Sequence, residues 1–420
     1  MSPRPWLALA LLAGVPLAAA LTPAERRIAA WVDTQTEQFA RDLEAAVRID
    51  SPTENLAGVR RMGGHFAAQL AELGFAARFV PLPESTGRAG HLVAERQGTR
   101  GKRVLLLGHL DTVLPGGSFR REGDTVHGSG VADMKGGDGV IIMALRALQA
   151  AGALDGAQII VVLTGDEEAV GRPHEVARKD LLEAAARSDV VLAFESAIGA
   201  TATVARRGSI SWELEVQGVT GHSSGIFSDA LGDGAVFELA RILEGFREQV
   251  RQLDGATLSP ALVTAGVEAE LTRTGGTAKG KTNIIPQRAL ARGDLRTVSA
   301  EQLAEAQTRM QEVVRKNLRR TSAVLKFDEG YPAMAPTPAN YALLAQLDEA
   351  SRDLGLGGIT AFDPRGRGAG DIAFVSPPLA GLDGLGLDGP GQHTAAEAAD
   401  LRQVPALVKR AAVLIHRLTR

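Results

Sequence analysis

Three short apolar runs in the first half of the chain are each followed by acidic or histidine residues. The runs are residues 103–108 (RVLLLG), 159–165 (IIVVLTG) and 190–194 (VVLAF). The residues that follow them are His109 and Asp111, then Glu167 and Glu168, then Glu195. Continuous Val, Ile and Leu runs are typical of strands buried on both faces, and functional residues of open α/β sheets gather beyond the carboxyl ends of such strands. The runs therefore predict an α/β sheet whose edge forms one rim of a cleft.

Two further residues complete a set suited to metal binding. They are Asp133 in ADMKGG and His393 in GQHTAAE, and the chain contains no Cys. Carboxylate oxygens with a few imidazoles and no thiolate suit a hydrolytic metal pair that keeps an open coordination position. The pattern predicts a metallohydrolase that holds two zinc ions.

Seven motifs stand in order along the chain. They are GHLDTVLP, GSGVADMKGG, TGDEE, FES, GHSS, NIIP with a following GDLR, and GQHTAAE. In this set the chain resembles the dinuclear zinc peptidase family that includes carboxypeptidase G, acetylornithine deacetylase and succinyl-diaminopimelate desuccinylase. The resemblance covers nearly the whole mature chain.

The resemblance implies a specific set of metal ligands. His109 and Glu195 would bind one zinc, Glu168 and His393 the other, and Asp133 would bridge both. Each ion then has three protein ligands and a shared water, as expected of catalytic rather than structural zinc. Such a pair lowers the pKa of the water and polarises the scissile carbonyl. Cobalt or manganese in place of zinc stays open.

Three further residues receive roles from the same resemblance. Asp111 would orient the ring of His109, and Glu167 would be the general base that passes a proton from water to the leaving amine. His222 in GHSS would reach the active site of a partner subunit and stabilise the oxyanion there. Asp166 in TGDEE has no assigned role and is interpreted as a solvated neighbour.

Residues in the second half carry the substrate clues. Asn283 and Arg296 match family positions that contact substrate, and Arg suits a two-point grip on a carboxylate. A surface salt bridge is the alternative for Arg296. The loop that contains Gly368 and Gly370 fits close approach of backbone amides to a ligand. Glu195 is typical of the carboxypeptidases and deacylases of the family, whereas its aminopeptidases tend to have Asp.

The order of elements predicts two domains. Helices are expected at 25–47, 56–73 and 137–151, and residues 209–325 read as strand, helix (229–250), two strands, helix (300–318) and strand (322–327). The second pattern matches a ferredoxin-like unit. We predict an α/β zinc-peptidase catalytic domain with a mixed, mainly parallel sheet, formed by residues 21–207 and 326–420. Residues 208–325 are the predicted insertion, a ferredoxin-like α+β lid and dimerisation domain.

The N-terminus has the pattern of an export signal. One Arg precedes an apolar core at residues 7–20, and Ala18 and Ala20 fit a cleavage site. Residues 1–20 are therefore predicted to be a signal peptide, which places the protein in the periplasm or outside the cell. An uncleaved anchor stays open, although Pro16 and the short core disfavour it.

The net charge argues against a nucleic-acid-binding protein, and Pro286 argues against a nucleotide-binding one. The formal net charge of −3 argues against nucleic acid as a partner. Residues 275–282 (GGTAKGKT) match a phosphate-loop pattern, but Pro286 would break the helix that such a loop requires. We interpret this segment as a solvated loop.

The function that the sequence supports best is hydrolysis of an amide bond next to a free carboxylate. The nearest activity is that of a glutamate carboxypeptidase acting on a small peptide, and the alternative is deacylation of an N-acyl amino acid. A non-catalytic exported protein that binds a metal or solute is disfavoured, because a binder has no need of Glu167. The resemblance also implies a homodimer.

Overall fold

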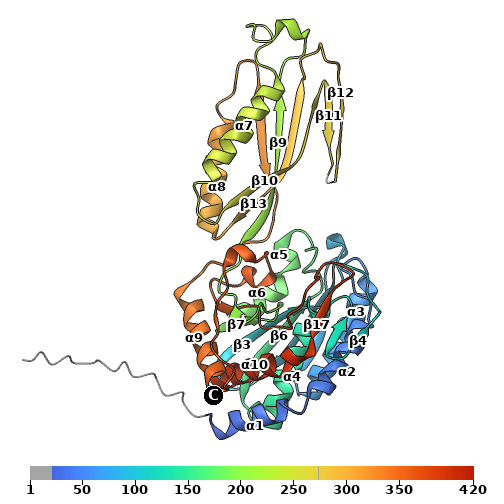
Figure 1. Cartoon of the computed structure of the whole chain (residues 1–420), viewed down its shortest axis with the longest axis vertical. Helices are drawn as coiled ribbons and strands as arrows, with labels where there is room; N and C mark the ends of the chain where they lie inside the picture. Colours follow the sequence, from blue (N-terminus) through green and yellow to red (C-terminus); the bar gives the residue numbers. More distant parts are fainter. Residues whose placement is uncertain (1–20, 273) are drawn as a thin grey trace, which may run out of the picture.

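The computed structural model describes residues 21–272 and 274–420, and Figure 1 shows them as two lobes. The predicted signal peptide, residues 1–20, lies outside the described residues. The lower lobe in Figure 1 holds a six-stranded sheet and the upper lobe a four-stranded one, each with its own helices. In the part of the chain that the structure describes, no helix is long and apolar enough to cross a membrane.

The sheet of the lower lobe is mixed and mainly parallel, as predicted. Its order is β1 (Ala76–Pro81), β2 (Gly90–Arg96), β6 (Ala157–Thr164), β3 (Arg100–His109), β7 (Val190–Ala193) and β16 (Ala380–Leu382). From β6 to β16 all neighbours are parallel, whereas β2 pairs antiparallel with both β1 and β6. The carboxyl ends of β6, β3 and β7 therefore lie at one edge.

Each central strand contains an unbroken apolar run because each face of the sheet has its own core. In β3, Val104 and Leu106 pack in one hydrophobic cluster, while Leu105 and Leu107 pack in a second cluster on the other face. Side chains of β6 and β7 alternate in the same way. Since successive side chains of a strand point to opposite faces, a strand covered on both sides needs an unbroken apolar run.

Helices cover both faces of this sheet. The larger cluster includes side chains from α1 (Pro23–Val32), α2 (Thr36–Val47), α3 (Leu56–Glu72), α4 (Lys135–Ala150), α9 (Pro338–Asp353) and α10 (Val404–Thr419). The other face is covered by α6 (Lys179–Ala186), which follows the short α5 (His174–Ala177). Helix α10 packs against α4 and β3, so the end of the chain returns to the lobe that its first half begins.

One predicted helix is broken. The prediction of a single helix over residues 25–47 is wrong, because α1 ends at Val32 and α2 begins at Thr36. The Thr34 hydroxyl donates a hydrogen bond to the carbonyl of Trp31 at 2.8 Å. Such local bonds between a side chain and the backbone compete with the helical pattern.

The upper lobe has the ferredoxin-like order of elements. Its elements are β9 (Gly208–Gln217), α7 (Ala235–Val250), β10 (Thr257–Gly266), β13 (Arg288–Thr297), α8 (Ala300–Val314) and β14 (Ser322–Phe327). The antiparallel sheet runs β10-β13-β9-β14, and α7 and α8 lie on one face (Figure 1). In the core between sheet and helices, Trp212 meets Phe246 edge to face, with ring centroids 5.6 Å apart. Its role in dimerisation stays a prediction.

Two details of the upper lobe differ from prediction. Helix α7 begins at Ala235 rather than near residue 229, because Gly232 and Gly234 have φ angles of 67° and 77°, outside the helical region. The interpretation of residues 275–282 as a solvated loop is correct in exposure but wrong for residues 276–279, which form a strand. Strand β12 (Gly276–Lys279) pairs with β11 (Glu268–Leu271) in a hairpin, and no helix follows at Thr282.

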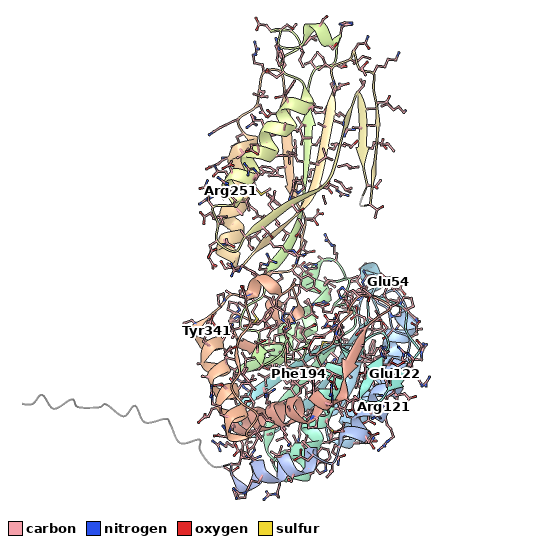
Figure 2. The ribbon with its side chains drawn as sticks, in the orientation of Figure 1. Glu54, Arg121, Glu122, Phe194, Arg251 and Tyr341 are labelled. Atoms are coloured by element: carbon pink, nitrogen blue, oxygen red, sulfur yellow. The ribbon has the colours of Figure 1, made fainter. Side chains whose placement is uncertain are left out.

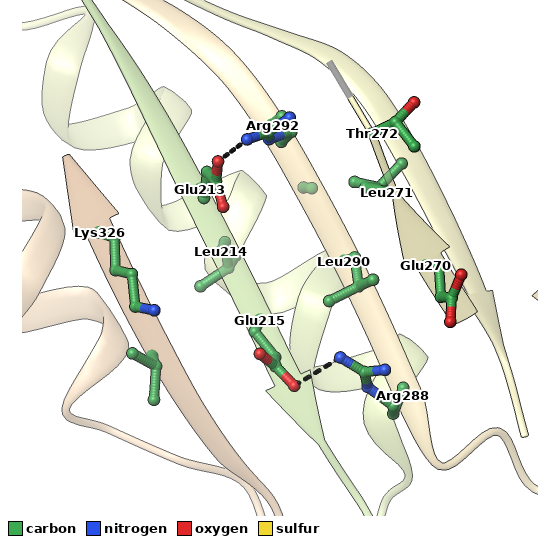
Figure 3. A pocket seen from close by; sticks show the side chains of 12 residues that line it. Glu213, Leu214, Glu215, Glu270, Leu271, Thr272, Arg288, Leu290, Arg292 and Lys326 are labelled. Carbon is green, nitrogen blue, oxygen red and sulfur yellow. Dashed lines mark hydrogen bonds and ion pairs between the residues drawn. The ribbon is translucent and has the colours of Figure 1, made fainter. Parts of the chain in front are cut away.

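The face of the upper sheet that the helices leave open holds a cavity of about 440 Å³ beside this hairpin (Figure 3). Its lining has three basic and three acidic side chains, namely Arg288, Arg292, Lys326, Glu213, Glu215 and Glu270. Arg288 pairs with Glu215 at 2.8 Å, and Arg292 pairs with Glu213. The face therefore carries balanced charge.

Short elements complete the fold and hold loops beside the main sheet. Strands β4 (Arg120–Glu122), β5 (Thr125–His127) and β17 (Ala398–Asp400) form a small sheet, and β8 (Thr201–Ala202) pairs with β15 (Thr360–Ala361). The short 3-10 helices are η1 (Glu84–Thr86), η2 (Ser223–Gly225), η3 (Pro364–Gly366), η4 (Asp371–Phe374) and η5 (Leu401–Gln403). The β17–β5 pairing brings the segment after His393 next to the segment before Asp133.

Two chain segments connect the lobes as an antiparallel pair. Arg206 and Met334 exchange two main-chain hydrogen bonds of 3.0 Å, and the Ser209 N–H donates to the carbonyl of Tyr331 at 3.1 Å. We call residues 206–209 and 331–334 the connecting ribbon.

Candidate metal centre

The predicted ligands come from strand ends and from two loops. His109 is the last residue of β3, Glu168 lies beyond the end of β6, and Glu195 lies beyond the end of β7. Asp133 lies just before α4, and His393 lies in the loop before β17. Because β6, β3 and β7 are parallel neighbours, their ends converge at one edge of the sheet.

Asp133 lies between two histidines. Its Oδ1 is 3.2 Å from Nε2 of His109, and its Oδ2 is 3.1 Å from Nε2 of His393. The two oxygens of one carboxylate thus face different imidazoles. A carboxylate shared by two metal ions needs this arrangement.

Each histidine also faces one glutamate. Nε2 of His109 is 3.5 Å from Oε1 of Glu195, and Nε2 of His393 is 3.3 Å from Oε2 of Glu168. These contacts sort the five residues into the two predicted sets, with Asp133 common to both. Metal ligation itself stays a prediction.

Glu167 belongs to the same cluster. One of its oxygens lies in a group with ligand atoms of His109 and Glu195, all within 4.8 Å of one another. Distance alone therefore permits Glu167 to act as a ligand or as a base, and the two roles differ in what its removal does to metal content.

Asp111 holds both a histidine ring and the turn that carries the two glutamates. It is fully buried. Nδ1 of His109 forms a hydrogen bond of 3.0 Å with the main-chain carbonyl of Asp111, and the Asp111 Oδ1 lies 3.4 Å from the same nitrogen. The same Oδ1 accepts the N–H of Glu167 at 3.0 Å, while Oδ2 accepts the N–H of Glu168 at 3.1 Å and the Thr53 hydroxyl at 2.7 Å. These contacts are compatible with a residue that orients His109, and that role stays a prediction.

The charges at the cluster act strongly on one another. Burial, and next the charge of Asp133, raise the pKa of Glu195 to about 7. Burial and the charge of Glu195 raise the pKa of Glu167 well above its ordinary value. Hydrogen bonds to Asp133 and Glu168 raise the pKa of His393 to about 10. The carboxylates thus outnumber the histidines that can neutralise them, and divalent cations would stabilise the group.

The donor set fits a pair of divalent ions. All ligand atoms are carboxylate oxygens or imidazole nitrogens, and Oε1 of Glu168 is buried with no hydrogen-bond partner. His393 is the exposed member, with 55% of its side chain accessible against 1% for His109. Its φ of 60° is unusual for a residue other than glycine and often marks a functional site. The cluster is therefore open to solvent on the His393 side.

Glu397 is a site residue that sequence reasoning missed. Its buried carboxylate accepts the N–H groups of Gly130 at 2.9 Å, Ala132 at 2.9 Å and Asp133 at 3.0 Å. It therefore anchors the loop of the proposed bridging residue from the segment that also carries His393. Its place as the last letter of GQHTAAE was the available signal, but an acid there has no distinctive pattern.

The prediction that Asp166 is a solvated neighbour is wrong. The residue is fully buried, and its Oδ1 pairs with Nη1 of Arg178 at 2.5 Å. Arg178 also donates through Nε to Oδ1 of Asp371 at 2.9 Å. The buried guanidinium thus joins the TGDEE turn to the loop of Gly368 and Gly370. No sequence signal links these residues, because tertiary packing alone brings them together.

The Gly368–Gly370 loop reaches the cluster through Arg206, a second residue that sequence reasoning missed. Nη1 of Arg206 donates to the carbonyls of Gly368 at 3.1 Å and Ala369 at 2.7 Å, and its Nη2 is 3.9 Å from Oε2 of Glu195. A Cβ at Gly370 would be 2.9 Å from the guanidinium carbon. A side chain at position 370 would therefore require the Arg206 guanidinium to move.

The other predicted residues lie in the upper lobe. His222 is exposed, with Nδ1 2.8 Å from the Ser224 hydroxyl, and its neighbour Ser223 donates its N–H to the Asn283 carbonyl at 2.9 Å. Arg296 pairs through Nε with Oδ2 of Asp294 at 2.8 Å. Among the described residues, no recorded contact joins His222, Asn283 or Arg296 to the cluster. The surface salt bridge of Arg296 is therefore present, and its contact with substrate stays a prediction.

Comparisons with known proteins agree with this architecture. The model of "Peptidase family M20/M25/M40" matches residues 105–417. Carboxypeptidase G2 of Pseudomonas sp. is 28% identical over 388 residues, which cover 89% of this chain and 88% of that protein. A succinyl-diaminopimelate desuccinylase of Novosphingobium aromaticivorans is 30% identical over 272 residues, which cover 61% of this chain and 69% of that enzyme.

Solved structures share the fold over most of the chain. Aminopeptidase PepT of Bacillus cereus superposes with a TM-score of 0.74 at 16% identity, over 92% of this chain and 99% of that chain. An M20 family metallo-carboxypeptidase of Sulfolobus solfataricus has a TM-score of 0.65 at 16% identity, over 90% of this chain and 98% of that chain. At these identities the likeness establishes the fold alone.

We predict that Glu397→Ala weakens metal retention by about 10–100-fold, as loss of residues behind metal ligands typically does. Three N–H groups would lose their acceptor, and the loop of Asp133 would relax. Metal content after dialysis against graded chelator measures the effect. Glu312→Ala, at an exposed position of α8, is the control and should match wild type. Equal retention by both variants would contradict the anchoring role.

Proposed function

The chain belongs to peptidase family M20/M25/M40 and is a hydrolytic enzyme, and from this premise we propose that it cleaves an amide bond adjacent to a free carboxylate. The nearest activity is that of a glutamate carboxypeptidase. Deacylation of an N-acyl amino acid is the alternative. The first is supported by the likeness to carboxypeptidase G2, and the second by the likeness to desuccinylases.

One observation carries the hydrolytic mechanism. The two oxygens of Asp133 lie 3.2 Å from His109 and 3.1 Å from His393, with a glutamate beside each histidine. We propose that these five residues hold two zinc ions, with cobalt or manganese as alternatives. Bound divalent ions lower the pKa of water and polarise a carbonyl.

In the proposed mechanism, Glu167 moves the proton. It accepts a proton from the attacking water and then donates it to the nitrogen of the leaving amine. Burial and the charge of Glu195 raise the pKa of Glu167 above the ordinary carboxyl value, the direction that helps a general base to hold the proton between the two transfers. Asp111 contributes by fixing the main chain of Glu167.

Specificity for a free carboxylate is assigned to Arg296, and the loop of Gly368 and Gly370 would offer backbone groups to the substrate. Glutamate rather than aspartate at position 195 agrees with a carboxypeptidase or deacylase. The exposed fraction of the Arg296 side chain is 36%, so its guanidinium remains accessible beside Asp294.

We further propose that the enzyme is an exported homodimer. Export rests on the sequence of residues 1–20, and dimerisation rests on the resemblance that assigns His222 to a partner's active site. The exposed position of His222 in the upper lobe is compatible with a role in trans.

We predict that Glu167→Gln retains both metal ions and lowers turnover by about 10²–10⁴-fold, the typical loss when a general base is removed. Asp133→Ala should instead lose metal, because it removes the ligand common to both ions. Turnover and metal content of the two purified variants are the measurements. A metal-free Glu167→Gln variant would show that Glu167 is a ligand and not only a base.

We expect Arg296→Ala to impair hydrolysis of substrates with a free C-terminal carboxylate much more than that of their amidated analogues. The matched control is Arg292→Ala, on the same strand and paired with Glu213. The ratio of kcat/KM for the two substrate types is the measurement. A similar loss on both types would indicate a structural salt bridge, which at an exposed position contributes little.

Mixing two inactive variants tests whether His222 acts across subunits. A His222→Ala subunit keeps its own cluster and Glu167, while a Glu167→Gln subunit keeps its His222. After joint unfolding and refolding, about half of the dimers are mixed, and each mixed dimer has one complete site of two. Activity should therefore recover to about a quarter of wild type. Mixed dimers, confirmed by mass, that remain inactive would mean that His222 does not act in trans.

A further inference from the structure

Tyr331 connects the ribbon between the lobes to the turn that carries Glu167. Its carbonyl accepts the N–H of Ser209, at the start of the first upper-lobe strand, at 3.1 Å. Its phenol hydroxyl donates to the main-chain carbonyl of Glu167 at 2.5 Å. One residue thus binds the upper lobe with its backbone and the active-site turn with its side chain.

The phenol ring is held in place by aromatic neighbours. Its centroid is 5.3 Å from the ring of Phe374 and 6.4 Å from that of His174. Phe374 is the last residue of η4, which directly follows the Gly368–Gly370 loop. These ring contacts direct the hydroxyl toward Glu167 and do not depend on the hydrogen bond. The ring of a Phe at position 331 would therefore pack in the same place.

The peptide groups on both sides of the Glu167 Cα are fixed by side chains. Asp111 accepts the Glu167 N–H at 3.0 Å, and Tyr331 donates to the Glu167 carbonyl at 2.5 Å. The next residue, Glu168, is also held by its N–H to Asp111 at 3.1 Å. Rotation of the turn would break these bonds, so the direction in which the Glu167 side chain leaves the backbone is constrained.

We propose that Tyr331 is a positioning residue for Glu167. It fixes the main chain of Glu167 relative to the cluster and to the connecting ribbon. The inference rests on the proposed role of Glu167 as the base. Tyr331 does not touch substrate or ligands in this assignment, and it acts only through the backbone of Glu167.

The test uses the two tyrosines of the chain, Tyr331 and Tyr341. Tyr331→Phe keeps the ring packing and removes the hydroxyl, and Tyr341→Phe, at a position 48% exposed on α9, is the control (Figure 2). For Tyr331→Phe we expect kcat to fall about tenfold, as loss of one well-placed hydrogen bond predicts. KM should stay within about twofold, and both metals should be retained. Tyr341→Phe should equal wild type.

A double-mutant cycle separates positioning from general support of the fold. If Tyr331 acts only through Glu167, adding Tyr331→Phe to Glu167→Gln should leave the residual rate unchanged, measured in single-turnover reactions with enzyme in excess. A further tenfold loss in that background would overturn the proposal, as would loss of metal from Tyr331→Phe. Wild-type activity of Glu167→Gln would instead overturn the base assignment, and with it this inference.

Discussion

Two oxygens of a single carboxylate, on Asp133, face the imidazoles of His109 and His393. These two histidines are far apart in the sequence, so the site exists only if the C-terminal segment returns to the first lobe. Helix α10 packs on α4 and β3, and β17 pairs with β5 next to the loop of Asp133. The apolar core of the lower lobe thereby holds together a group of charges that isolated segments could not hold. The free energy gained by burying many nonpolar groups offsets the repulsion between the carboxylates.

Acidic residues in this chain serve two different physical purposes. Some direct their oxygens into the cluster, as Glu168 and Glu195 do. Others satisfy main-chain N–H groups: Glu397 accepts three, including that of Asp133, and Asp111 accepts those of Glu167 and Glu168. Buried N–H groups require partners. A carboxylate that accepts several N–H groups makes a loop rigid. The carboxylates that bind main-chain N–H groups therefore limit how far the carboxylates of the cluster can move.

Much of the fold could be predicted, and the failures have local causes. The unbroken apolar runs predicted strands covered on both faces, and the alternation of Val104 and Leu105 between two cores is the reason. The order of strands and helices in the upper lobe was also predictable. The helix over residues 25–47 is broken because the Thr34 side chain bonds to the backbone. Asp166 looked solvated because its partner Arg178 is adjacent only in the folded chain. The hairpin of β11 and β12 was not predicted, because the short polar segment of β12 has no apolar pattern typical of a strand.

The sequence by itself determined the family resemblance, the residue types of the candidate site and the strands that carry three of its members. Spacing along a strand is local, so apolar periodicity and motif order can be read without a structure. Only the tertiary structure decided that the two oxygens of Asp133 face different histidines, and that Glu397, Arg206 and Tyr331 contact the residues of the candidate site. These residues join segments distant in sequence, and their hydrogen bonds depend on directions and distances that exist only once the lobes have packed.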